Sequence, residues 1–407
     1  MSVDIPSTAT LTTRLLHAGS PTLRDGSGPV NVPVVRTSTV RFENCAALED
    51  YHHRRAAGER VASYGRHGLD THRALEDAIT ALEGGYRTFL APSGLSAITL
   101  VLLALLSPGD HALVADSVYA PVRRVDTTLL QRLGITLEYF SPSSPNVQDD
   151  LAQKIRPNTR LLYLESPSSL LYEVLDLPML AAIAHQHGIP IATDNTWSGG
   201  WFHQPLKLGA NISIQATTKY ISGHSDVMQG VVVVDSPALA AKIATTHEAL
   251  GLVISADDAY LALRGLRTLP VRLVQHQRNA TQVAQWLEQQ PQVARVFYPA
   301  LPGDPGHVLW QRDFSGASGL VSFAFVDAVN TQAATAFVDA LRWFAIGASW
   351  GGYESLAQIA APERLREHST WQGTQPVVRL HVGLEDSKDL VEDLRQAMAL
   401  MLVPPLS

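Results

Sequence analysis

Short apolar runs alternate with helical patterns from about residue 60 to residue 265, and this alternation constrains the fold more than any other feature. The expected strands are residues 87–90, 111–115, 135–140, 161–164, 190–193, 212–215 and 230–234. Helical patterns at residues 93–106, 120–133 and 177–187 separate several of them. Continuous apolar strands that are joined by helices predict a mostly parallel sheet, buried on both faces. We therefore expect an α/β fold in this region.

The pattern changes after residue 265. Residues 266–290 predict one long helix or two, and residues 387–402 predict a closing helix that Ser387 begins. Between them, expected strands at residues 293–298, 320–325 and 377–382 predict a second, smaller sheet. We expect three parts: an N-terminal arm (1–65), an α/β domain (66–265) and a C-terminal α+β domain (266–407).

Composition and charge argue against several classes of function. The 407 residues carry a formal net charge of -7, and no basic run marks a surface for nucleic acid. The single cysteine, Cys45, excludes a disulfide within the chain and a thiolate metal cluster, and it agrees with a reducing cytoplasm. The longest apolar stretch, residues 95–106, is shorter than the roughly 20 residues that a membrane span needs. Residues 1–13 do not resemble a signal peptide. We expect a cytoplasmic protein that contacts neither membrane nor nucleic acid and that binds no metal.

Several chemically distinct groups follow the expected strands. Asp194 comes directly after residues 190–193, and Lys219 follows residues 212–215. The helix after the first strand begins with Gly94 and Leu95, and Tyr119 follows the second strand. Because ligands of such sheets bind outside the carboxyl ends of the strands, we expect these groups to surround one cleft.

One cofactor, pyridoxal phosphate, uses all of these groups. It needs a lysine for a Schiff base and a carboxylate that keeps its ring nitrogen protonated. A helix N-terminus suits its phosphate, and an aromatic ring can stack on its pyridine face. Each group also has an ordinary structural explanation, as a surface lysine, a helix-capping aspartate, a turn glycine or a core tyrosine. On the residues alone, these alternatives stay open.

A longer motif surrounds the lysine. Residues 218–226 read Thr-Lys-Tyr-Ile-Ser-Gly-His-Ser-Asp and resemble the cofactor-lysine signature of the Cys/Met-metabolism class of pyridoxal phosphate enzymes. The resemblance covers about residues 13–402 and implies the aspartate-aminotransferase-like fold (fold type I), with a large sheet domain and a small C-terminal α+β domain. Further matching motifs are Tyr64-Gly65-Arg66, Leu82-Glu83-Gly84-Gly85, Glu165-Ser166-Pro167, Asp194-Asn195-Thr196, Arg264-Gly265-Leu266-Arg267-Thr268-Leu269 and Arg379-Leu380-His381.

The resemblance also implies a role for individual residues. Lys219 would form the Schiff base and act as general base, Asp194 would pair with the pyridinium nitrogen, and Tyr119 would stack on the ring and assist catalysis. Residues expected at the cofactor phosphate are Gly94, Leu95 and Thr218 of one subunit, and Tyr64 and Arg66 of its neighbour. Residues expected at the substrate are Arg379, Ser349, Trp350 and Tyr64. Because two chains would share each site, the resemblance implies a homodimer or homotetramer.

Physical chemistry agrees with the roles given to the arginines. The planar guanidinium of Arg379 suits a substrate carboxylate because it binds in a bidentate manner, and that of Arg66 suits a phosphate for the same reason. Arg379 lies in a strand of alternating character, so a surface salt bridge is its structural alternative.

Within the class, the chain most resembles the bacterial cystathionine β-lyases. Trp197, Ser169 and residues 349–355 and 381–386 carry this resemblance. It implies a carbon–sulfur lyase of methionine biosynthesis, which converts L-cystathionine to homocysteine, pyruvate and ammonia by β-elimination. Ala120 departs from the pattern, since these relatives have an acidic residue after the stacking tyrosine.

Other functions stay open on the residues. One is a cysteine desulfhydrase or another C–S β-lyase, and a second is a cystathionine γ-lyase or γ-synthase. A third, of a different class, is a non-catalytic regulatory protein that binds pyridoxal phosphate. The combined presence of Lys219, Asp194, Tyr119 and Arg379 argues against this last function.

Overall fold

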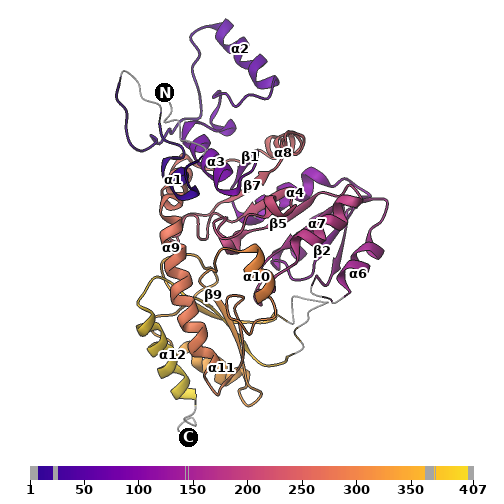
Figure 1. Ribbon diagram of the computed structural model, residues 1–407. Helices are drawn as coiled ribbons and strands as arrows, with labels where there is room; N and C mark the ends of the chain where they lie inside the picture. Colours follow the sequence, from indigo (N-terminus) through magenta and orange to yellow (C-terminus); the bar gives the residue numbers. More distant parts are fainter. Residues whose placement is uncertain are drawn as a thin grey trace.

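The molecule has two β-sheets, and the long helix α9 (Ala256–Glu288) extends along one side from the larger sheet to the smaller (Figure 1). The computed structural model describes residues 8–21, 26–142, 144, 146–362, 371 and 373–401. The expected α/β fold with a second, smaller sheet is confirmed.

The larger sheet has seven strands, of which all but one point in the same direction. They are β1 (Arg87–Ala91), β2 (His111–Ala115), β3 (Thr136–Phe140), β4 (Thr159–Glu165), β5 (Ile191–Asp194), β6 (Ile212–Gln215) and β7 (Gly230–Val234). Their order is β1-β7-β6-β5-β4-β2-β3. Only β7 runs antiparallel to its neighbours, β1 and β6. The carboxyl ends of the other strands therefore meet at one edge.

Helices cover both faces of this sheet. On β7, Val232 and Val234 pack in one apolar cluster with α4 (Gly94–Leu105) and α7 (Leu177–Gln186). Val231 and Val233 pack in a second cluster with α3 (Asp70–Glu83) and α9. Because successive strand residues point to opposite faces, a run of consecutive valines is buried on both sides. α8 (Pro237–Ala249) packs against α4.

The smaller sheet has five strands in the order β10-β11-β12-β9-β8. They are β8 (Val293–Phe297), β9 (Leu320–Phe325), β10 (Ala345–Ile346), β11 (Leu356–Ala360) and β12 (Val377–His381). The sequence does not predict β10 or β11, because β10 is short and exposed and β11 is only partly buried. The helices α11 (Thr331–Asp339) and α12 (Ser387–Met401) pack together beside it.

α9 begins earlier than the sequence predicts. The hydroxyl of Ser255 accepts a hydrogen bond from the backbone N–H of Asp258 (3.0 Å) and caps the helix at Ala256. The expected domain division between residues 265 and 266 falls inside this helix. We propose that the two sheets define the two domains and that α9 belongs to both.

The helix expected at residues 120–133 is interrupted. α5 (Pro121–Val125) is followed by a π-helical turn (Asp126–Leu130) and a 3-10 turn (Gln131–Leu133). The hydroxyls of Thr127 and Thr128 donate to backbone carbonyls of the preceding turn. Such side-chain bonds compete with the regular helical pattern and bend a helix.

The N-terminal arm contains two helices, α1 (Leu11–His17) and α2 (Cys45–Ala56). α1 packs against α3 and α9, whereas α2 projects from the body of the molecule (Figure 1). The remaining elements are α6 (Val147–Lys154), α10 (His307–Asp313) and 3-10 turns at Gly65–His67, Thr196–Ser198 and Pro205–Leu208.

Neither a membrane span nor a metal cluster is found among the described residues. No helix there has the length and apolar character to cross a bilayer. No group of three or more His, Cys, Asp or Glu side chains in these ranges is arranged to hold a metal ion.

Candidate active site

The carboxyl edge of the larger sheet carries the candidate catalytic groups. Asp194 is the last residue of β5, and Glu165, the last residue of β4, is its partner in the sheet register. β6 ends at Gln215, and the chain then turns so that the Lys219 backbone N–H donates to the Ala216 carbonyl (3.0 Å). Parallel strands thus deliver a carboxylate and a lysine to the same edge.

The Lys219 side chain reaches from the larger sheet to a loop of the smaller domain. Its Nζ donates to the Oγ of Ser349 (2.8 Å) and lies 5.2 Å from the ring centroid of Trp350. Burial and the charge of Arg379 lower the pKa of Lys219 to about 8, although Asp194 acts in the opposite direction. A lysine with such a pKa can lose its proton near neutral pH and act as a nucleophile or a base.

Asp194 is a buried carboxylate, 9% exposed. Its Oδ1 accepts a hydrogen bond from the Thr196 backbone N–H (2.9 Å). Burial raises the pKa of Asp194, whereas the Thr196 hydrogen bonds and the charge of Lys219 lower it. A carboxylate in this position would be stabilised by a protonated ring nitrogen beside it.

Tyr119 lies near this carboxylate with 46% of its surface exposed. Its backbone N–H donates to Glu165 Oε2 (2.5 Å). Burial, Asp194 and Glu165 raise the pKa of Tyr119, and Arg379 lowers it. The sequence gives no role to Glu165, although its position at the end of a parallel strand is the signal that could have identified it.

The N-terminus of α4 lies close to the loop that carries Lys219. Ser93 caps it, since the Ser93 hydroxyl accepts from the Ser96 N–H (3.1 Å). A Cβ at Gly94 would lie 2.7 Å from the Ala216 Cβ, so only glycine lets α4 and the Lys219 loop meet. The first N–H groups of a helix, here those of Gly94 and Leu95, lack partners within it and suit an anion.

Thr218 precedes Lys219 and is tied to the segment before β7. Its hydroxyl donates to the Gln229 carbonyl (3.0 Å) and accepts from the Gln229 backbone N–H (2.9 Å). These bonds hold the Lys219 loop.

Arg379 is buried, 8% exposed, rather than on the surface. It lies on β12, and its Nη2 donates to the carbonyls of Ala348 (3.3 Å) and Ser349 (3.1 Å). Its Nε is buried and has no hydrogen-bond partner among the residues that the structure describes. A buried donor without a partner is costly, so this guanidinium is suited to a carboxylate that enters the site.

Two further residues of the β-lyase-like pattern lie around the site. Trp197 is 5% exposed and packs in the apolar cluster of the smaller sheet, where its ring and that of Phe314 are nearly perpendicular, with centroids 5.9 Å apart. The Ser169 N–H donates to the Ser117 carbonyl (3.0 Å), beside the loop that carries Tyr119.

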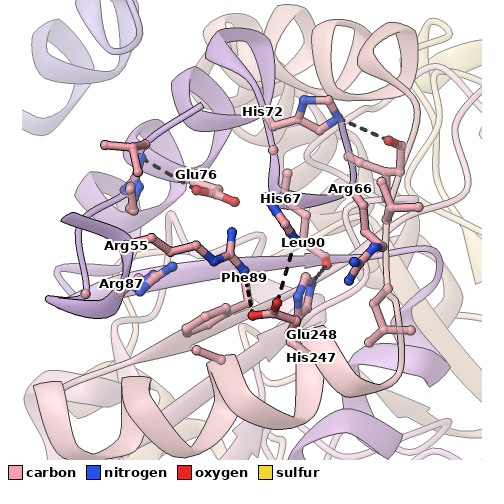
Figure 2. A pocket seen from close by; sticks show the side chains of 18 of the residues that line it. Arg55, Arg66, His67, His72, Glu76, Arg87, Phe89, Leu90, His247 and Glu248 are labelled. Carbon is pink, nitrogen blue, oxygen red and sulfur yellow. Dashed lines mark hydrogen bonds and ion pairs between the residues drawn. The ribbon is translucent and has the colours of Figure 1, made fainter. Parts of the chain in front are cut away.

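Tyr64 and Arg66 are not brought to Lys219 within one chain. Tyr64 is 44% exposed, and the Arg66 Cζ lies 5.9 Å from its ring centroid. Arg66 lines a separate cavity of about 200 Å³ between the residue 58–68 segment, α3, β1 and α8. Figure 2 shows Arg66 among the residues that line this cavity, and its charge acts on His67 there.

The residues at the sheet edge fit pyridoxal phosphate. The site supplies the groups that this cofactor needs: a lysine of lowered pKa, a buried carboxylate, a helix N-terminus that begins with glycine, and a half-exposed tyrosine ring. The unpartnered Nε of Arg379 adds a place for an acidic substrate.

Comparison with known proteins identifies the family of the chain. The model of the Cys/Met metabolism PLP-dependent enzyme family matches residues 12–399. A cystathionine beta-lyase of Bordetella avium is 51% identical over 95% of this chain and 96% of its own length. Cystathionine beta-lyase MetC of Escherichia coli is 39% identical over 96% of this chain and 98% of its own.

Solved structures agree as well. A cystathionine gamma synthase from Xanthomonas oryzae pv. oryzae, in complex with aminoacrylate and cysteine, superposes with a TM-score of 0.86 at 32% identity. It covers 97% of this chain and 98% of its own. The metB structure from Corynebacterium glutamicum gives 0.88 at 29% identity, over 98% of this chain and 100% of its own. The chain therefore belongs to the family of pyridoxal-phosphate-dependent enzymes of Cys/Met metabolism.

Proposed function

We propose that this chain is a carbon–sulfur lyase that cleaves L-cystathionine by β-elimination to homocysteine, pyruvate and ammonia, as a step of methionine biosynthesis. The observation that carries the chemistry is the contact between Lys219 and Ser349, because it sets a lysine of lowered pKa beside the loop bound to Arg379. The relatives named cystathionine beta-lyase, which match nearly the whole chain, support the choice of substrate.

The residues of the sheet edge would hold the cofactor. Lys219 would bond to its aldehyde carbon, Asp194 would lie at its ring nitrogen, and the start of α4 with Thr218 would bind its phosphate. Bound pyridoxal phosphate supplies an electron sink for the bond that breaks at the substrate Cα. An ordinary tyrosine is already protonated near neutral pH, and burial raises the pKa of Tyr119 further, so its phenol suits a stacking ring that donates a hydrogen bond.

The substrate would be oriented by the smaller domain. The fork of Arg379 would bind the α-carboxylate, with Ser349 and Trp350 on the loop beside it. This arrangement turns the Cα–H bond toward the Nζ of Lys219, which already lies 2.8 Å from Ser349.

Lys219 would then move the proton. Once the substrate amine has replaced it at the cofactor's aldehyde carbon, Lys219 would be a free amine, and with its pKa lowered to about 8 it would accept the Cα proton as a general base. The Cβ–S bond breaks, and the protonated Lys219 returns a proton to the sulfur, so that homocysteine leaves as a thiol. The three-carbon fragment takes up water and yields pyruvate and ammonia.

We further propose a cytoplasmic homodimer or homotetramer with shared active sites. The exposure of Tyr64 and the position of Arg66 in a separate cavity support this, since neither contacts Lys219 within the described part of one chain. The single cysteine agrees with a reducing compartment.

The test is product identification with the purified, cofactor-loaded protein. L-cystathionine and L-cysteine are supplied side by side, and keto acids and thiols are identified by mass spectrometry. Pyruvate and homocysteine from cystathionine, at a higher kcat/KM than pyruvate from cysteine, are expected. 2-Oxobutyrate would replace the proposal with γ-elimination, preference for cysteine would indicate a desulfhydrase, and no turnover would indicate a binding protein.

A further inference from the structure

Glu83 is a carboxylate buried behind the candidate site. It is the last residue of α3, and its exposed fraction is 0%. Its two oxygens accept hydrogen bonds from the Asn195 side-chain amide, at 3.3 Å each, and Oε1 also accepts from the Gln215 side-chain amide. Burial raises the pKa of Glu83 to about 7, and these hydrogen bonds act in the opposite direction.

The surroundings of Glu83 are closely packed and contain neutral donors. A Cβ at Gly200 would lie 2.6 Å from Gln215 Nε2 and 2.9 Å from Glu83 Oε1, so only glycine fits there. Within the described ranges, no lysine or arginine pairs with Glu83. A buried carboxylate is costly unless its hydrogen bonds are satisfied, and here amides from two separate segments satisfy it.

The first of these amides belongs to the Asp194 loop. Asn195 follows Asp194 directly, and its backbone N–H donates to the Ile214 carbonyl of β6 (2.8 Å). Its side-chain oxygen accepts from the Ser198 hydroxyl (2.6 Å). Asn195 is 1% exposed, so neighbouring atoms surround its side chain.

The second amide belongs to the Lys219 loop. Gln215 ends β6, and Ala216, the next residue, donates its backbone N–H to the Thr196 hydroxyl (2.9 Å). Thr196 in turn binds Asp194 through its backbone N–H. Glu83 therefore closes a hydrogen-bond network that joins the two loops.

We infer that Glu83 is a positioning residue of the cofactor site, which sets the spacing between the Asp194 carboxylate and the Lys219 amine by holding one amide from each loop. The inference rests on the proposed roles of Lys219 and Asp194. These two groups must meet opposite ends of one rigid ring, and such geometry has to hold within about 0.5 Å. A single acceptor shared by both loops provides that constraint.

Glu83→Gln tests the inference in the full-length, cofactor-loaded protein. Glutamine has one acceptor oxygen, and its NH2 group would face one of the two donors, Asn195 or Gln215. At least one loop therefore loses its hydrogen bond to residue 83. We expect the Kd for pyridoxal phosphate to rise about tenfold, the loss of one net hydrogen bond. The pH midpoint of the yellow absorbance of the lysine-bound cofactor should shift as well.

A reciprocal exchange provides the rescue. In Glu83→Gln with Gln215→Glu, residue 83 accepts from Asn195 and donates to the new carboxylate, so both loops are held again. We expect this double variant to recover most of the affinity and the wild-type midpoint. If the folded double variant fails to recover either the cofactor affinity or the pH midpoint, the inference is overturned.

Asp393→Asn is the matched control for loss of a buried carboxylate. Asp393 is 3% exposed and accepts from the backbone N–H groups of Arg342 (2.9 Å) and Trp343 (2.7 Å), in the smaller domain. It should lower the Tm and leave the cofactor Kd and midpoint unchanged. If Glu83→Gln likewise lowers the Tm and leaves the cofactor Kd and midpoint unchanged, Glu83 has only a structural role.

Two further variants separate the possible failures. If Glu83→Gln does not fold, Gln215→Ala removes only the donor of the Lys219 loop and should raise the Kd similarly; an unchanged Kd contradicts the inference. If Lys219→Ala keeps the yellow absorbance, the site itself is misassigned. If Lys219→Ala loses it while Glu83→Gln matches wild type, only the role of Glu83 is wrong.

Discussion

The Nζ of Lys219 lies 2.8 Å from the Oγ of Ser349, although 130 residues separate them. Lys219 belongs to the larger sheet, and Ser349 belongs to the loop whose carbonyls bind Arg379 of the smaller sheet. A Cβ at Gly351 would lie 2.8 Å from the Lys219 backbone, so the two domains meet closely here. One contact therefore joins the group proposed to bind the cofactor to the loop proposed to bind the substrate carboxylate.

Replacement of Lys219 should abolish the reaction. Lys219→Ala removes the amine proposed to bond to the cofactor and to accept the Cα proton. We expect the yellow absorbance of the lysine-bound cofactor to disappear and cystathionine turnover to fall by at least about a thousandfold, as general-base and covalent contributions are lost together. Lys207→Ala, at an exposed lysine, is the control and should match wild type. Turnover retained in Lys219→Ala would rule out the mechanism.

Arg379→Lys should weaken substrate binding more than it slows chemistry. Lysine keeps the charge but lacks the planar fork and the Nε that is buried without a partner. We expect KM for cystathionine to rise by about tenfold or more, roughly 1.4 kcal/mol, with a smaller change in kcat. Steady-state kinetics measure this split. Arg312→Lys, at a surface ion pair with Asp176, should leave both constants unchanged.

The cofactor-free protein should react with pyridoxal phosphate in a pH-dependent manner. Burial disfavours the charged ammonium, so the pKa of Lys219 falls from 10.5 to about 8 and the reactive neutral amine predominates above that pH. The rate of appearance of the yellow absorbance should rise through about pH 8 and then level off. Arg379→Gln removes a charge that lowers this pKa, and its profile should move to higher pH. A wild-type rate that still rises toward pH 10.5 would contradict the lowered pKa.

Some of this site could be predicted from sequence because it follows from local patterns. Asp194 ends a buried apolar strand and Lys219 lies four residues after another, and parallel strands carry their ends to one edge. The contact with Ser349 could not be predicted, since it depends on how the second domain packs. Arg379 lies in a strand that looks half-exposed, yet the loop of residues 348–349 covers it.

Glu83 and Glu165 were missed for a related reason. Acidic residues are usually exposed, so neither the motifs that contain these two residues nor the strand-end position of Glu165 shows by itself that their side chains are partly or fully buried. Their partners, Gln215 and Tyr119, come from distant segments of the chain. Only the three-dimensional arrangement shows that each carboxylate holds a loop of the candidate site.

Gly94→Ala should weaken cofactor binding by overpacking. The added Cβ would lie 2.7 Å from the Cβ of Ala216, so α4 and the Lys219 loop must separate. Overpacking of this kind costs about 1–3 kcal/mol, and we expect the Kd for pyridoxal phosphate to rise about tenfold. Equilibrium dialysis measures it. Gly303→Ala is the control, because its Cβ would meet nothing nearer than 3.9 Å. An unchanged Kd in Gly94→Ala would show that this contact can relax without affecting the phosphate site.

Mixed oligomers test whether two chains share each site. Arg66→Ala and Lys219→Ala should each be nearly inactive alone. The first lacks the proposed phosphate contact, and the second lacks the amine proposed to bond to the cofactor. In a mixed dimer, the chain with intact Lys219 would receive an intact Arg66 from its partner, so one functional site forms. Random pairing gives mixed dimers in about half of the molecules, each with one site of two, and thus about a quarter of wild-type activity.

The outcome separates a shared site from a local one. If Arg66 acted within its own chain, every chain of the mixture would lack either Arg66 or Lys219, and no pairing could restore activity. Its place in a cavity apart from Lys219 favours the shared arrangement. Mixing Lys219→Ala with Asp194→Ala is the control: both groups lie at one sheet edge of the same chain, so these variants should not complement each other.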